Sequence, residues 1–87
     1  MYVIIVYDAG VKRLNKVRIF LKQYLNWVQN SVFEGELTKA EYLRIRLRLK
    51  DLIDEDEDCI FMYSVRDRKY LEIDELGTRK AEIDTII

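Results

Sequence analysis

The chain has 87 residues and a mass of 10.5 kDa, which is enough for one domain with a single hydrophobic core. Hydrophobic residues make up 49% of it and charged residues 36%, a balance typical of folded globular proteins. Histidine is absent, which excludes imidazole bases and ligands, and the single cysteine, Cys59, excludes an internal disulfide. Any chemistry therefore falls to carboxylates, hydroxyls, cations or a bound metal ion.

The net charge of −1 conceals an asymmetry along the chain. Residues 1–50 carry ten basic and four acidic side chains, whereas residues 51–87 carry five basic and twelve acidic ones. The first part can present a basic face to a polyanion, although the solvated outer faces of two helices would show the same composition. No run of about 18 apolar residues is present, and a lone cysteine suits a reducing compartment. We therefore expect a cytoplasmic protein without a membrane segment.

Residues 2–7 (YVIIVY) predict a buried strand, because β-branched and aromatic residues follow one another without interruption. A glycine-containing turn at 8–10 ends it. Across residues 11–28, apolar residues recur at steps of three and four while basic residues fill the gaps, which predicts an amphipathic helix. Residues 27–36 return to strand composition, with a bulge or turn at 30–31, and predict a second strand region that is kinked or doubled.

Thr38 and Glu41 form a capping-box pair, which predicts that a helix begins there and continues to Ile53. Residues 43–49 alternate with period two, which alone would favour a strand, but the cap and the unbroken run of good helix formers favour the helix. Its apolar residues then form two stripes, one facing the sheet and the other a second contact such as another subunit. The stripes are Ala40, Leu43 and Leu47, and Ile45, Leu49 and Leu52.

The acidic run at residues 54–58 (DEDED) predicts a solvated loop after this helix. Asp54, Asp56 and Asp58 have the spacing of the first ligands of an EF-hand calcium loop. That reading fails, because Cys59 stands where the loop requires glycine and Val65 where it requires glutamate.

Residues 59–65 (CIFMYSV) predict a third strand, joined by a turn at 66–69 to a fourth strand at 70–76 (YLEIDEL). The apolar end at 82–87 is expected to pair as an extra strand beyond its own sheet. This order predicts one α+β domain over residues 1–87, a two-layer sandwich with two helices on one face of a mostly antiparallel four-stranded sheet. The other sheet face needs a cover, so we expect a twofold homodimer.

Asp8 is the leading candidate for chemistry, because it stands where a hydrophobic strand gives way to a glycine-containing loop beside a basic helix. Mg²⁺ is commonly held by one or two carboxylates, water and phosphate oxygens, and a twofold axis near Asp8 would add a second carboxylate. An aspartate at a strand end can equally cap the following helix, and that alternative stays open here. Two groups of cations can contact phosphates. They are Lys12, Arg13, Lys16 and Arg18, and Arg44, Arg46, Arg48 and Lys50.

Three sequence blocks carry a resemblance to a known family: Tyr7-Asp8, Lys16-Val17 and, above all, residues 28–35 (VQNSVFEG). With them, the chain resembles the small CRISPR-associated adaptation protein family, the metal-dependent, nuclease-like partner of the larger spacer integrase. The resemblance covers nearly the whole chain. It implies a ferredoxin-like fold, a symmetric homodimer and a C-terminal strand, within residues 78–87, that is added to the sheet of the dimer partner.

The resemblance also implies that two copies of Asp8 flank a divalent metal, Mg²⁺ or Mn²⁺, with Tyr7 and Phe33 nearby. Asp8 is then the metal ligand, Asp8 and Tyr7 are the catalytic residues, and cleavage of RNA or DNA during spacer acquisition is the expected activity. Two alternatives remain: a non-catalytic dimeric scaffold that bridges integrase subunits on DNA, and a toxin-like ribonuclease of the same fold. The residues expected to bind nucleic acid are Lys12, Arg13, Lys16, Arg18 and Phe33.

Overall fold

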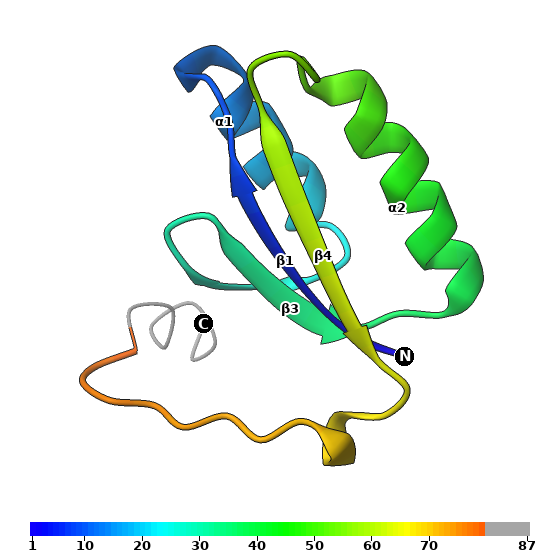
Figure 1. The fold of residues 1–87 in the computed structure, drawn as a ribbon, viewed down its shortest axis with the longest axis vertical. Helices are drawn as coiled ribbons and strands as arrows, with labels where there is room; N and C mark the ends of the chain where they lie inside the picture. Colours follow the sequence, from blue (N-terminus) through cyan, green and yellow to red (C-terminus); the bar gives the residue numbers. More distant parts are fainter. Residues whose placement is uncertain (80–87) are drawn as a thin grey trace.

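The computed structural model describes residues 1–79. The sheet has the strand order β2-β3-β1-β4 with antiparallel neighbours throughout, and both long helices cover the same face of it (Figure 1). The predicted α+β two-layer architecture is thereby confirmed. In chain order the elements are β1 (Tyr2–Asp8), α1 (Val11–Leu21), β2 (Asn26–Gln29), β3 (Val32–Glu36), α2 (Lys39–Leu52), β4 (Cys59–Val65) and the short 3-10 helix η1 (Arg68–Tyr70).

The core lies between the sheet and the two helices, and the alternation of β1 decides which residues enter it. Val3, Ile5 and Tyr7 point toward the helices and are at most 4% exposed, whereas the residues between them face the opposite side. Because β1 is the central strand, its inward side chains pack against both helices and against β3. The other fully or nearly fully buried apolar residues are Val17, Leu21, Leu25, Phe33, Leu37, Ile45 and Leu49.

The region predicted as a kinked or doubled strand is a hairpin of two strands, β2 and β3. Asn30 makes the turn with a left-handed backbone (φ 43°), a conformation that asparagine tolerates better than most residues. The Trp27 indole nitrogen donates to the Asn30 carbonyl at 2.9 Å and holds the turn closed. Helix α1 ends at Leu21, earlier than its apolar periodicity predicts, and Leu25 instead packs against Gly35 of β3.

Helix α2 begins with the predicted capping box. The Thr38 hydroxyl accepts the Glu41 amide proton at 3.1 Å, and the Glu41 carboxylate accepts the Thr38 amide proton at 2.8 Å. Of the two predicted apolar stripes, the one with Ile45 enters the core, whereas Leu47 of the other stripe is 66% exposed. Within residues 1–79, neither helix is long and apolar enough to cross a bilayer.

The prediction of a strand at residues 70–76 is wrong. Residues 68–70 form a single 3-10 turn, started by the Asp67 carboxylate, which accepts the Lys69 amide proton at 3.0 Å. The chain then runs without regular structure below the sheet toward the β3 side (Figure 1). The fourth strand of the sheet is β2. The extra strand predicted at 82–87 lies outside the described residues, as does most of the tail at 78–87.

Candidate functional site

Asp8 ends β1 on the sheet face that points away from the helices, where its side chain is exposed. Its partner in the β1–β4 register is Cys59, the first residue of β4, which is also exposed. Within residues 1–79 Asp8 takes part in no ion pair. The same residues contain no cluster of three or more acidic or cysteine side chains that could hold a metal. At the end of β1, one chain therefore offers a hydrated cation the carboxylate of Asp8 without a described cluster of further ligands.

Asp8 does not cap α1, so the capping alternative is not what the structure shows. The N-cap residue is Gly10, no side chain caps the helix, and its first turn contains no acid. The amide groups at this end carry a partial positive charge, which favours an anion such as a phosphate near the β1–α1 loop. Lys12, in the first turn, and Lys16, one turn further, are both exposed and add to that potential.

Tyr7 and Phe33 lie in the core, on the opposite side of the sheet from Asp8. Their rings stack at 6.2 Å with an interplanar angle of 23°. Burial raises the pKa of the Tyr7 phenol, while the Ser31 hydrogen bond and the charge of Arg18 act in the other direction. Phe33 has 0% of its surface exposed, so it cannot contact nucleic acid, and the prediction for Phe33 is wrong. Adjacent strand residues face opposite sides, which is why Tyr7 and Asp8 diverge.

The four basic candidates on α1 divide into two kinds. Lys12, Lys16 and Arg18 are exposed, and Arg18 makes one hydrogen bond, from Nη2 to Asn15 Oδ1 at 3.2 Å. Arg13 is instead turned toward the loop before β4. Three of the four side chains are therefore accessible to phosphates on this helix.

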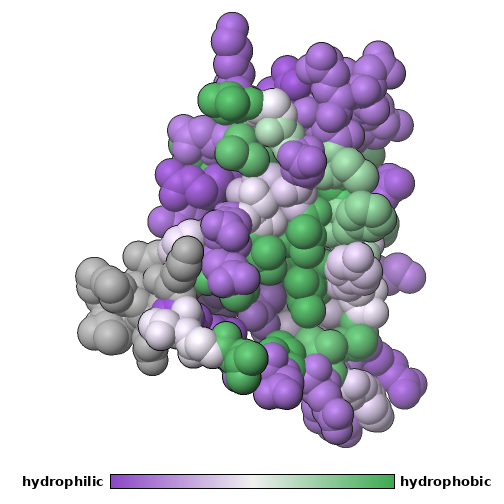
Figure 2. Space-filling view, turned by 60° about the vertical axis from the view of Figure 1, so that its left-hand side comes forward, coloured by the Kyte–Doolittle hydropathy of each residue, from purple (hydrophilic) through white to green (hydrophobic). Residues whose placement is uncertain are grey.

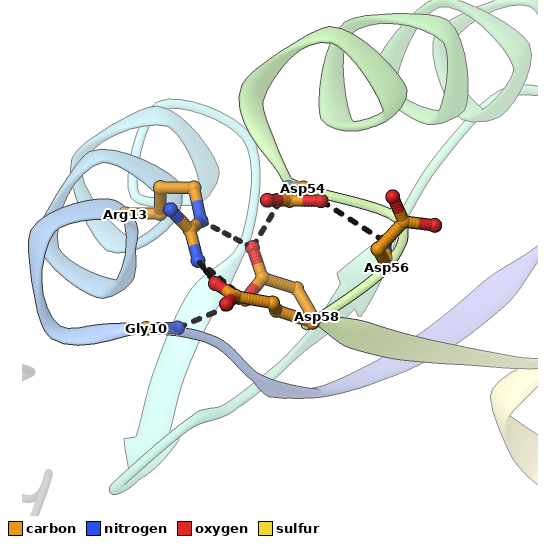
Figure 3. Close-up of polar contacts among 6 residues, drawn as sticks. Gly10, Arg13, Asp54, Asp56 and Asp58 are labelled. Atoms are coloured by element: carbon orange, nitrogen blue, oxygen red, sulfur yellow. Dashed lines mark hydrogen bonds and ion pairs between the residues drawn. The ribbon is translucent and has the colours of Figure 1, made fainter.

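Arg13 is held by Asp58 in a compact set of contacts, called here the Asp58 clasp (Figure 3). Arg13 donates to both oxygens of this carboxylate, from Nε to Oδ2 at 2.6 Å and from Nη2 to Oδ1 at 3.1 Å. The Gly10 amide donates to Oδ1 at 2.9 Å and the Asp54 amide to Oδ2 at 2.8 Å. The side chain of Asp58 is completely buried, and that of Arg13 is 26% exposed.

The clasp corrects the prediction of a solvated loop at one residue, because Glu55, Asp56 and Glu57 are exposed as expected but Asp58 is buried. The Arg13 hydrogen bond, followed by the Asp54 amide, holds the pKa of Asp58 well below its usual range, so this buried carboxyl is ionised at neutral pH. Five alternating acids give no sign of which one is buried. Only the β1–β4 register, which sets Asp58 beside the β1–α1 loop, identifies it.

The sheet face that carries Asp8 is largely apolar. Ile4 and Val6 of β1 lie beside Phe61 and Tyr63 of β4, whose side chains are each 57% exposed and stack on one another at 6.2 Å. Figure 2 shows the resulting column of hydrophobic side chains with hydrophilic groups around it. No described element covers this column.

At the β3 side of this face, a polar cluster forms around Glu34, which is 9% exposed. The Tyr2 hydroxyl donates to Glu34 in a short hydrogen bond, and Arg79 Nη2 lies 3.4 Å from its other oxygen. Burial, followed by the Glu34 hydrogen bond, raises the pKa of Tyr2 to about 12. The cluster fixes the segment after η1 against β3, and sequence patterns did not reveal it because its members are far apart along the chain.

Comparison with known proteins identifies the family. The profile described as "CRISPR associated protein Cas2" matches residues 1–73. Proteins named CRISPR-associated endoribonuclease Cas2 from Methanosarcina acetivorans and Pyrococcus furiosus are 68% and 52% identical, in both cases over the full length of both chains. A crystal structure titled as that of Cas2 superposes with a TM-score of 0.84 at 46% identity, covering 93% of this chain and 91% of that one. On the shared sequence and the shared fold, the chain belongs to the CRISPR-associated Cas2 family.

Proposed function

We propose that the protein is a divalent-metal-dependent endonuclease of CRISPR adaptation, acting in the cytoplasm as a homodimer on RNA or DNA. The observation that carries the proposal is the position of Asp8. It is an exposed carboxylate without an ion-pair partner in residues 1–79, between an apolar sheet face and the positive end of α1. The names of its relatives, which are called endoribonucleases, support the same reaction class.

The carboxylate of Asp8 is the kind of ligand that a divalent metal would bind here, because Mg²⁺ and Mn²⁺ prefer hard oxygen ligands. A single chain supplies one such ligand, and a second copy related by a twofold axis would supply the other. When bound, a divalent cation lowers the pKa of a coordinated water and offsets phosphate charge. The chain's own part is to hold that cation through Asp8 and to bind the phosphate backbone through Lys12 and Lys16.

The uncovered apolar column supports the homodimer. A face on which Phe61 and Tyr63 are exposed beside the half-buried Ile4 and Val6 is typical of a surface that another protein covers. Self-association is the commonest arrangement among soluble oligomers, and a twofold contact on this face would bring the two Asp8 side chains to the same side of the assembly.

Asp8→Asn tests the catalytic role, because it keeps the size of the side chain and removes the charge. We expect Mg²⁺-dependent cleavage of labelled RNA and duplex DNA to fall by about 100-fold or more, as for loss of a metal ligand or its support. The matched control is Asp51→Asn, an exposed aspartate on α2, which should cleave at the wild-type rate. Wild-type cleavage by Asp8→Asn protein, with activity following the protein through purification, would show that Asp8 is not catalytic.

A second candidate is a non-catalytic scaffold that bridges subunits of the spacer integrase on DNA. The observation that favours it is the amount of uncovered apolar surface, which includes Leu43 and Leu47 on α2, 50% and 66% exposed, besides the sheet face. Spacer acquisition in cells distinguishes the two. Acquisition that persists with Asp8→Asn supports the scaffold, and its loss together with cleavage supports the endonuclease.

A further inference from the structure

Asp8 is fixed by contacts on both sides of it. On one side, it is the last residue of β1 paired in register with Cys59 of β4. On the other, Gly10, two residues later, donates its amide proton to Asp58, the residue directly before Cys59. These two links close a small ring around Asp8 and Ala9, so the backbone that aims the Asp8 side chain is held at both ends.

The local hydrogen bonds of the β1–α1 loop tie it only to α1, since the Gly10 carbonyl accepts the amide protons of Arg13 and Leu14. Its last residue, Gly10, is the N-cap of α1 but has no side chain with which to cap it. Without the bond to Asp58, Asp8 would be held on one side only, by its pairing with Cys59, and a glycine-containing loop with wide conformational freedom would follow it. The anchor therefore comes from a residue 48 positions away in the chain.

Arg13 is what allows Asp58 to serve as that anchor. An ionised carboxylate with no exposed surface is strongly destabilising unless a cation and hydrogen bonds compensate it, and the Arg13 guanidinium supplies both. Gly10 leaves room for this contact, because a Cβ atom there would lie 2.6 Å from Arg13 Nη2. Gly10, Arg13 and Asp58 thus contact one another beside the loop that carries Asp8.

We propose that Asp58 and Arg13 are positioning residues for Asp8, and that Arg13 serves the site through this contact and not by binding phosphate. The inference rests on the proposed function, in which Asp8 is the metal ligand. Arg13 is then a residue that positions Asp8 and not one that binds nucleic acid, while Lys12 and Lys16 remain the residues expected to bind phosphate.

Asp58→Asn tests the positioning role, with Glu55→Gln, an exposed acid of the same loop, as the matched control. We expect Asp58→Asn to lower kcat for Mg²⁺-dependent cleavage by about 10- to 100-fold, the effect of a small misplacement of a catalytic group, with KM changed by less than about twofold. Mn²⁺ binding followed by electron paramagnetic resonance should weaken in Asp58→Asn and be lost in Asp8→Asn. Unchanged kcat and Mn²⁺ affinity in folded Asp58→Asn protein would overturn the inference.

Gly10→Ala provides a second route if Asp58→Asn does not fold. The added methyl group displaces the guanidinium while both charged residues remain, so we expect a smaller loss of kcat, of about 3- to 10-fold. Circular dichroism shows whether each variant is folded. A folded Gly10→Ala protein with wild-type kcat would contradict the proposal independently of Asp58→Asn.

The salt dependence of nucleic-acid binding tests the second half of the proposal without requiring cleavage. A residue that neutralises a phosphate contributes close to one to the slope of log affinity against log salt concentration. We expect Lys12→Gln to reduce this slope by about one and Arg13→Gln to leave it unchanged. A reduced slope with Arg13→Gln would show direct phosphate contact.

The cleavage and Mn²⁺-binding assays also distinguish failure of the two proposals. If the wild-type protein neither cleaves nor binds Mn²⁺, the proposed function fails and the positioning role fails with it. If the wild-type protein cleaves and binds Mn²⁺, and Asp58→Asn protein does both equally well, only the positioning role is rejected.

Discussion

Replacing Phe33 by leucine separates a packing role from a nucleic-acid-binding role. Phe33 has no exposed surface and stacks on Tyr7, so Phe33→Leu removes an aromatic pair worth about 0.5–1.5 kcal/mol and leaves part of its volume unfilled. We expect the free energy of unfolding to fall by about 1–3 kcal/mol. At about 0.05–0.15 kcal/mol per residue, the whole domain has about 4–13 kcal/mol, so the variant should remain folded at 25 °C.

Urea unfolding followed by circular dichroism measures this loss, with wild type and variants compared at one protein concentration because a dimer gains stability with concentration. The affinity for RNA and duplex DNA, measured in parallel without urea, should stay within about twofold of wild type. Tyr70→Leu is the control: this ring is 58% exposed, so its loss should change stability by less than about 0.5 kcal/mol. An unchanged urea midpoint for Phe33→Leu together with a tenfold loss of affinity would refute the burial argument.

Four further outcomes are expected elsewhere in the fold. Thr38→Ala should lower the free energy of unfolding by about 1 kcal/mol in urea titrations, because the Glu41 amide loses its capping acceptor. Hydrogen bonds from Thr38, first from its backbone, hold the pKa of the Glu41 carboxyl below its ordinary value of 4.5. The stability that these bonds add is therefore complete above pH 4.5 and is lost as the pH falls through the lower pKa of the folded state. A comparison of Tm against pH for wild type and Glu41→Gln should show this loss of stability. For Tyr2, whose pKa is raised from 10.0 to about 12, the associated stability is complete below pH 10 and lost as the pH rises toward 12, and Glu34→Gln should lower this pKa in a phenolate absorbance titration. Asn30→Ala should cost about 1 kcal/mol in urea unfolding because of its left-handed backbone, whereas Asn30→Gly should be close to neutral.

The parts of the fold that depend on neighbouring residues could be predicted from the sequence. The capping box of Thr38 and Glu41 is a signal four residues long, and the helix that it predicts begins where expected. Strand β1 is equally local, since a run of β-branched and aromatic residues specifies it. The position of Asp8 is local too, because the end of strand β1 is visible in the sequence.

The failures concern features that depend on distant partners. Residues 70–76 alternate like a strand, yet an alternating pattern does not show whether the chain turns back to pair with a neighbour. In the structure they pair with neither edge strand of the sheet, β4 or β2. The burial of Asp58 depends on the register between β1 and β4, which no local pattern encodes. Phe33 was expected near Asp8, but only the pairing of β3 with β1 shows that its ring faces the helices.

The central position of β1 affects how the protein is made. The first strand to be synthesised pairs on one edge with β3 and on the other with β4, whose last residue is Val65. At about 5–20 residues per second, translation from the end of β1 to the end of β4 takes about 3–11 s. Both edges of this hydrophobic strand lack a partner until β3 has been synthesised, and one edge lacks a partner until β4 has been, which is a condition that favours aggregation. The order of synthesis therefore leaves the strand on which the whole sheet is assembled exposed for longest before the sheet is complete.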